Sequence, residues 1–173
     1  GEPPTMEYVE SIERLVLAHP EVIGVHDLIV HDYGPGRAMI SLHAEVPANG
    51  DFILLHDAID NIEKELREAL GCDAVIHMDP VVTNDEETKR LKRMAEAIVR
   101  CIDPCLSIHD FRMVSGPTHT NLVFDVVVPY AVHLSDDEVR ERINTCIRDR
   151  GEQYYAVISI DKTSLLSYEK PDD

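Results

Sequence analysis

The sequence predicts an α+β fold built from two tandem ferredoxin-like units, each with the element order α-β-β-α-β. The first observation behind this prediction is an internal repeat, in which Val25-His26-Asp27-Leu28 returns as Ile108-His109-Asp110-Phe111. Gly34-Pro35, Val46-Pro47 and Asp79 each recur as well, at one common spacing. The second observation is the periodicity within each copy, where helical spacing of apolar residues gives way to strict alternation. Small sheets covered by helices on one face form α+β sandwiches of this kind.

The first copy is expected at residues 7–82. Apolar residues at helical spacing between 9 and 16 predict a helix that ends before Pro20. Strands are expected at residues 24–33 and 39–46, on either side of a tight turn at Gly34-Pro35-Gly36. A second helix should run from about Asp51 to a C-cap at Gly71. Residues 74–80 complete the copy as a strand that Pro80 is expected to stop.

The second copy is expected at residues 83–166. A helix over residues 85–102 precedes strands near 107–115 and 121–129. Ser135 is the expected N-cap of the next helix, because three acidic residues follow it in the first turn. Residues 155–162 form the last strand, and residues 167–173 are expected to be a polar tail.

Composition excludes several classes of function. The net charge is −17 and there is no basic stripe, which argues against nucleic acid and against anionic lipid surfaces as partners. The apolar runs are too short to span a bilayer, so the chain is expected to be soluble. The four cysteines lack the spacing of a zinc ribbon and are expected to be free, buried thiols.

Four histidines and one aspartate of the first copy are the candidate metal ligands. Strand alternation places His43 on the polar face of its strand, and His77 and Asp79 share one face of the closing strand. His26 lies on the first strand and His56 in the first turn of a helix. If these strands are neighbours, the side chains can converge, and the two oxygens of Asp79 could bridge two cations. On spacing alone, the alternative is that these are ordinary polar residues of a strand surface.

An ordered set of motifs covering about residues 7–81 adds a family resemblance. The motifs are Gly24-Val25-His26-Asp27-Leu28, Tyr33-Gly34-Pro35-Gly36, Ser41-Leu42-His43-Ala44-Glu45-Val46, His56-Asp57 and Val75-Ile76-His77-Met78-Asp79-Pro80. Together they resemble the C-terminal cytoplasmic domain of cation diffusion facilitator transporters, a cation efflux family. The resemblance implies a metallochaperone-like module that forms a homodimer and uses His26, His43, His56, His77 and Asp79 as metal ligands.

The resemblance also implies a larger protein around this fragment. Residues 1–6 are expected to follow the last membrane helix of the protein's own transmembrane domain, which would place the module at the cytoplasmic face of the membrane. Such a module would bind divalent cations and help to gate proton-coupled export, but it could not transport by itself. Zn(II) is the first expectation for the metal, and Mn(II), Co(II), Ni(II) and Fe(II) are alternatives.

The second copy keeps only part of the ligand set. His109 and Asp161 match His26 and Asp79, whereas Asp125 stands where the first copy has His43. These three residues could hold one harder cation, such as Mn(II) or Mg(II), and the alternative is a purely structural role.

Three functions compete at this stage. The leading hypothesis is a regulatory, dimerising metal-binding domain of a cation exporter, and it is not an enzyme. A metal-dependent hydrolase would need a general base near the metal, for which Glu45 and Glu63 are the candidates. The sequence contains no recognisable catalytic signature such as H-E-x-x-H. The third hypothesis is a dimerisation scaffold without a physiological metal.

Overall fold

The chain is mixed α+β, as predicted, and divides after Val81 into two compact units. The structure is a computed structural model that describes residues 4–82 and 85–163. The expected polar tail at 167–173, residues 1–3 of the expected start and residues 83–84 therefore lie outside the described residues. Each unit shows the element order α-β-β-α-β and is treated by itself here.

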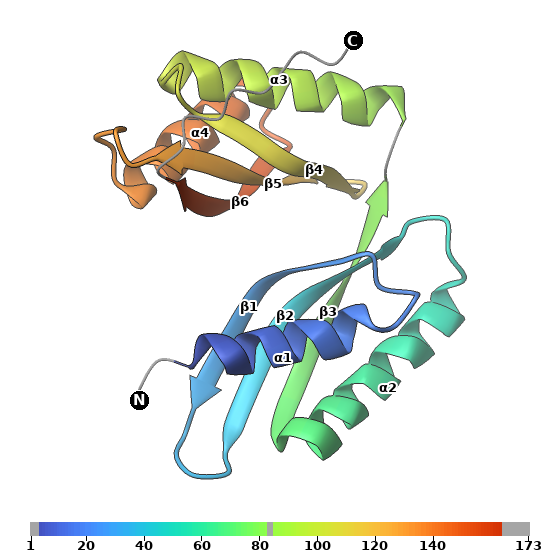
Figure 1. Cartoon of the computed structure of the whole chain (residues 1–173). Coiled ribbons are helices and arrows are strands. Elements are labelled where there is room, and N and C mark those ends of the chain that lie inside the picture. The colour runs from blue at the N-terminus through green and yellow to red at the C-terminus, as the bar shows by residue number, and fades with distance from the viewer. Residues whose placement is uncertain (1–3, 83–84, 164–173) are drawn as a thin grey trace. The chain divides into compact units, whose positions relative to one another are not determined.

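The first unit packs two helices on one face of a three-stranded sheet (Figure 1). Its elements are α1 (Met6–Leu17), β1 (Gly24–Asp32), β2 (Ala38–Pro47), α2 (Phe52–Leu70) and β3 (Cys72–Val82). Ile12 of α1 and Ile62 and Leu66 of α2 are fully buried against Ile40 and Leu42 of β2. The alternate residues of β2, among them His43, lie on the other side of the sheet, which we call the outer face.

The ends of α2 form as the sequence predicts. The carboxylate of Asp51 accepts hydrogen bonds from the backbone N–H groups of Ile53 and Leu54, at 2.9 and 3.1 Å. At the other end Gly71 adopts the left-handed conformation, with φ 63°, and ends the helix. These two caps fix where α2 begins and ends, and so where β3 starts.

Strand pairing brings three separate segments of the first unit side by side. β1 pairs with β2 in the antiparallel sense, and β2 pairs with β3 in the parallel sense. The prediction that Pro80 stops the last strand is wrong, because β3 continues through Pro80, paired with Val46, to Val82. Proline lacks only its own N–H, so its neighbours still pair and the strand can continue.

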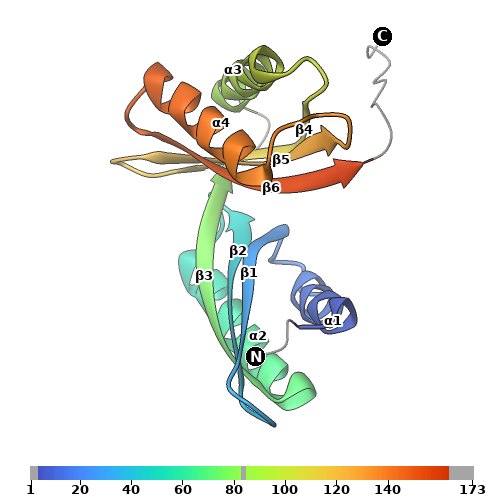
Figure 2. The same cartoon turned by 90° about the vertical axis from the view of Figure 1, so that its left-hand side faces the viewer.

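The second unit repeats this arrangement over α3 (Glu86–Ile102), β4 (Ser107–Ser115), β5 (Thr120–Pro129), α4 (Asp136–Arg150) and β6 (Tyr154–Thr163). α3 and α4 both lie on one side of its three strands (Figure 2). The expected N-cap of α4 is confirmed, because Ser135 and Glu138 form a reciprocal capping box.

Both units carry an irregularity at the same place in their first strand. The register of β1 against β2 shifts between His26 and Ile29, and that of β4 against β5 shifts between His109 and Arg112. Asp27 and Asp110 sit in these shifts with positive φ values of 52° and 50°. Aspartate tolerates the left-handed region better than most residues, which is consistent with a β-bulge at both positions.

The thiols depart from the sequence-based expectation. All four cysteines are free, but Cys72 alone is buried, whereas Cys101 and Cys105 are exposed and Cys146 is half-buried. Cys101 lies on α3 outside the apolar stripe of that helix, and Cys105 lies beyond the end of α3. None of the helices in the described part of the chain is long and apolar enough to cross a membrane.

Candidate metal centre

Three histidines form a row across the outer face of the first sheet. His26 on β1 pairs with His43 on β2, and His43 pairs in turn with His77 on β3. The ring centroids are 4.9 Å apart for the first pair and 4.7 Å apart for the second. The register alone therefore places one imidazole from each strand side by side, as the alternation pattern predicted.

Asp79 is the centre of this cluster. Its Oδ2 lies 2.9 Å from Nδ1 of His43 and 3.2 Å from Nε2 of His26, and its Oδ1 lies 3.1 Å from Nε2 of His77. The Asp79 side chain is only 6% exposed, whereas those of His43 and His77 are 37% and 67% exposed. One buried carboxylate thus contacts three imidazoles from three strands, and two of these imidazoles face solvent.

Glu45, which the sequence offered only as a general base, is a member of the site. It is 2% exposed, and its Oε1 accepts a hydrogen bond from Nδ1 of His26 at 2.8 Å. Gly24 leaves room for this carboxylate, because a Cβ at that position would lie 2.5 Å from Oε2 of Glu45. The signal in the sequence was its position two residues after His43, on the same strand face. A carboxylate behind a histidine is a common means of orienting a metal ligand.

The buried carboxylates control the charge of His26. Burial by itself lowers the pKa of this imidazole, but the hydrogen bonds to Asp79 and Glu45 outweigh burial and raise the pKa to about 9. For Asp79 the directions are reversed, because burial disfavours its charged form and raises its pKa. The contacts with His26 and His43 lower this pKa, and the lowering prevails over burial. Without a metal, His26 is therefore an imidazolium held between two carboxylates, so the pocket already stabilises one positive charge.

The donor set and its spacing fit a divalent cation. Ligand atoms of His43, His77 and Asp79 all lie within 4.8 Å of one another, and so do those of His26, Asp27 and His43. In a tetrahedral zinc shell with bonds of about 2.1 Å, ligand atoms are roughly 3.4 Å apart, so small side-chain rotations would close either group. Imidazole with carboxylate suits zinc and the neighbouring transition metals.

Comparison with known proteins finds similarity in the first unit. Residues 4–81 match the family model of the cation efflux protein, cytoplasmic domain. This segment is similar to that family throughout its length. The family is a transporter's cytoplasmic domain and not a class of enzymes. We refer to residues 4–81 below as the cation efflux domain.

The relatives match this same part of the chain. An uncharacterized transporter of Methanocaldococcus jannaschii is 35% identical over 82 residues, which is 47% of this chain and 29% of that protein. The chain thus spans under a third of that relative. Two structures of CzrB, a proposed zinc transporter, are 31% and, in the zinc form, 26% identical. They cover 46% and 50% of this chain and 98% and 99% of their own, with TM-scores of 0.42 and 0.43.

The remaining predicted ligand of the cation efflux domain, His56, is not part of either group. It lies in the second turn of α2, where its side chain is 61% exposed. Its Nδ1 is 3.9 Å from a carboxylate oxygen of Asp60, and its ring is 6.2 Å from that of Phe52. Within one chain, the structure therefore brings together four of the five predicted ligands.

The two glutamates considered as general bases are both engaged in structural hydrogen bonds. Glu45 is bonded to His26, and Oε1 of Glu63 accepts the backbone N–H of Ile76 at 2.9 Å. Both carboxylates therefore have a structural role in this unit.

The corresponding face of the second unit differs. His109 pairs with Asp125 on β5, but His109 and Asp161 are both exposed. Burial raises the pKa of Asp125, and Asp161 adds to this rise, while the positive charge of Arg112 opposes it. His109, Asp125 and Asp161 do not form a group with ligand atoms within 4.8 Å of one another. The three predicted residues are close enough for His109 and Asp161 to affect the pKa of Asp125, but they do not form a compact group of ligands.

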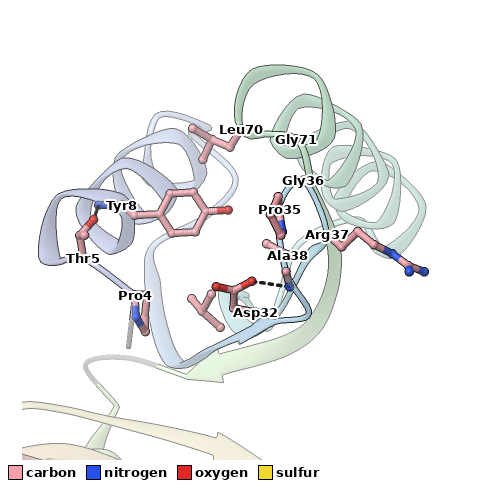
Figure 3. A pocket seen from close by; sticks show the side chains of 12 residues that line it. Pro4, Thr5, Tyr8, Asp32, Pro35, Gly36, Arg37, Ala38, Leu70 and Gly71 are labelled. Carbon is pink, nitrogen blue, oxygen red and sulfur yellow. Dashed lines mark hydrogen bonds between the residues drawn. The ribbon is translucent and has the colours of Figure 1, made fainter. Parts of the chain in front are cut away.

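The cation efflux domain also has a hollow of about 530 Å³, which lies away from the histidines (Figure 3). It is lined by the start of α1, the turn after β1 and the end of α2. The Tyr8 hydroxyl points into it, and burial raises its pKa to about 12. Asp32 accepts the backbone N–H of Gly34 at 2.8 Å. With one phenol and one bonded carboxylate, this hollow lacks the donors of a metal centre.

Proposed function

We propose that the chain is the cytoplasmic regulatory and dimerising part of a proton-coupled divalent metal cation exporter. In this proposal His26, His43, His77 and Asp79 bind the cation, with Zn(II) as the first candidate. The observation that supports it best is the contact of one buried carboxylate, Asp79, with three imidazoles from three strands. Imidazole and carboxylate together suit zinc and its neighbours, and clusters of groups with shifted pKa values are typical of functional sites.

Metal binding would displace a proton from the cluster. His26 is protonated near neutral pH, so its Nε2 becomes a metal ligand only after it loses a proton. Glu45 would keep its hydrogen bond from Nδ1 of His26 and hold the ring in place. A divalent cation then replaces one positive charge by two between Asp79 and Glu45, which partly offsets the cost of burying the two carboxylates.

Exposure of the site suggests how binding would tighten a homodimer. His43 and His77 reach the surface, so an ion bound to them would keep coordination positions open toward solvent. Ile29, Met39 and Val75 are exposed large apolar residues of the same three strands. A second copy could cover this apolar surface and complete the coordination shell, and the exposed His56 is available for that contact.

The link to transport rests on the family. A cation efflux domain would report the metal concentration to the protein's own transmembrane domain at the cytoplasmic face of the membrane. The ion that the full-length protein exports, and the coupling of export to protons, are part of this proposal.

The test is isothermal titration of Zn(II), and separately Mn(II), into chelator-stripped protein, with the mass followed by light scattering. We expect saturable binding, growth of the dimer fraction and a thermal shift on the order of 10 °C, because a ligand at 100 times its Kd contributes about 2.7 kcal/mol. The variant H43A/D79N should lose all three responses. The matched control H109A/D161N should keep them. A double variant H43A/D79N that still binds and dimerises would overturn the proposal, and a dimer indifferent to metal would leave a scaffold.

A further inference from the structure

The hollow between the start of α1 and the end of α2 has the composition of a small-molecule site. Its volume of about 530 Å³ lies within the range of about 300 to 1,000 Å³ that is typical of ligand pockets. Its floor consists of side chains that also pack against the core of the first unit, namely Tyr8, Val30, Ala38 and Leu70. An apolar floor with a few polar groups around it is the usual lining of a site for an organic ligand.

The Tyr8 hydroxyl is the first of these polar groups. Its oxygen is buried and has no hydrogen-bond partner among the described residues. Cys72 lies near it, but a thiol is a weak acceptor, and this thiol donates to the carbonyl of Leu66 at 3.6 Å. Burial, and then Cys72, raise the pKa of Tyr8 to about 12, so the phenol keeps its proton at neutral pH. A ligand atom that accepts this proton in a hydrogen bond would satisfy a donor that is otherwise costly to bury.

Asp32 brings a negative charge to the same space. Its carboxylate and the Tyr8 hydroxyl both point into the hollow (Figure 3). One carboxylate oxygen accepts the backbone N–H of Gly34 at 2.8 Å, and the carboxylate has further lone pairs for a ligand. Arg37 also lines the hollow, but its guanidinium points away from it (Figure 3). In a chain with a net charge of −17, these groups favour a cationic ligand over an anion.

We propose that this hollow binds a small organic amine, with its ammonium group on the carboxylate of Asp32 and an acceptor atom on the Tyr8 hydroxyl. The apolar part of the molecule would pack against Val30 and Leu70, which line the hollow. The site shares no residue with the histidine cluster, so the inference is independent of metal binding.

The test is titration of metal-free, isotope-labelled protein with L-leucinamide, followed by two-dimensional amide NMR. This probe has an ammonium group, a carbonyl acceptor and an apolar side chain. At about pH 6.5 it is mainly protonated, because the pKa of an α-amino group is about 7.7 to 8.0. The comparison ligands are 4-methylpentanamide, which is the same molecule without its amine, and the anion of N-acetylleucine. Saturable shifts are expected at the amides of Gly34, Gly36 and Gly71, which line the hollow.

Two variants remove one polar group each. D32N should weaken binding of L-leucinamide by about tenfold or more and remove its advantage over 4-methylpentanamide. Y8F should weaken both ligands by roughly threefold to tenfold. Without ligand, Y8F should not lower the melting temperature, because it removes a buried hydroxyl that has no partner among the described residues.

Matched controls show whether these effects are specific to the hollow. Y33F and D149N make the same changes at exposed residues outside the hollow, and both should bind L-leucinamide as the unaltered protein does. The variant H43A/D79N should also bind it unchanged, which separates this site from the metal centre.

Three results would overturn the proposal. The first is that L-leucinamide causes no saturable shifts at the hollow, or binds no better than the two comparison ligands. The second is undiminished binding in D32N. The third is a lower melting temperature for ligand-free Y8F, which would mean that the hydroxyl already has a partner. None of these results bears on metal binding, so the proposed function would stand.

Discussion

The two units have the same element order and strand pairing, but different side chains line the outer faces of their sheets. In the first unit the row across the three strands is His26, His43 and His77, and Asp79 beneath it is buried. In the second unit the corresponding row is His109, Asp125 and Ser159, and Asp161 is exposed. The repeated fold therefore places corresponding residues at the same positions of both sheets. Whether these residues form a compact cluster depends on their side chains.

A further difference between the units is a charged residue just after the bulge. The first unit has the uncharged Ile29 just after its bulge, 51% exposed, whereas the second has Arg112 at the corresponding position. Arg112 opposes the rise in the pKa of Asp125 that burial and Asp161 cause. The second unit thus carries its own cation next to its carboxylates, whereas in the first unit the cation must be a proton on His26 or a bound metal.

The largest effect is expected from removing the central carboxylate in each unit. D79N should weaken Zn(II) binding by at least about 100-fold and destabilise the metal-free protein by about 3 kcal/mol, because buried His26 loses an ionic partner. D161N, at an exposed site, should change stability by no more than about 0.5 kcal/mol. Calorimetry and urea unfolding measure both. Equal effects of the two substitutions would mean that the units are equivalent.

Exchanging the residue after the bulge should transfer the property of one unit to the other. In I29R a guanidinium next to Asp27 would repel the incoming ion, and we expect Zn(II) binding to weaken by roughly tenfold or more. I29Q, with a polar but uncharged side chain, is the control and should bind as the unaltered protein does. Because Ile29 is half exposed, neither change should unfold the chain. Unaltered binding in I29R would remove Arg112 as the reason for the difference.

The stability of the metal-free protein should depend on pH through His26 of the first unit. The folded state raises the pKa of His26 to about 9, so this group stabilises the metal-free protein fully below about pH 6.5, the unfolded value. That stabilisation is lost as the pH rises from about 6.5 to 9. Urea unfolding across this range should show the loss in the unaltered protein and less of it in E45Q. Zn(II) binding at pH 7 should release a proton from His26, which calorimetry in buffers of different ionisation enthalpy detects. A flat stability profile would contradict the assigned charge of His26.

The smallest effects are expected from removing the N-caps of α2 and α4, the helices that precede the last strand of each unit. D51A at α2 and S135A at α4 should each cost about 1 kcal/mol, because each removes a side chain that accepts backbone N–H groups. Hydrogen exchange resolved by residue should show D51A weakening the first unit and S135A the second. D51A should also weaken metal binding slightly, since α2 precedes the strand that carries His77 and Asp79. A loss of protection spread evenly over both units would show that they unfold together.

Much of the site was accessible from the sequence because the side chains of a strand alternate. Period-two alternation put His43 on the polar face, and the spacing of His77 and Asp79 put them on one face of β3. The exposure of Asp27 was not predicted, since alternation assigns it to the inner face. Its signal is the spacing of Val25, Leu28 and Val30, which repeats at Ile108, Phe111 and Met113 and marks the extra residue in each strand.

The sequence by itself determined the element order, the helix caps and the residues that share a strand face, because these follow from local periodicity and from hydrogen bonds between near neighbours. Tertiary structure decided what periodicity does not contain. It buried Asp79 and Glu45 around His26, exposed Asp161 and kept His56 out of the cluster of its own chain. Burial depends on which strands become neighbours and on what packs between them, and both are set by contacts between residues distant in the sequence.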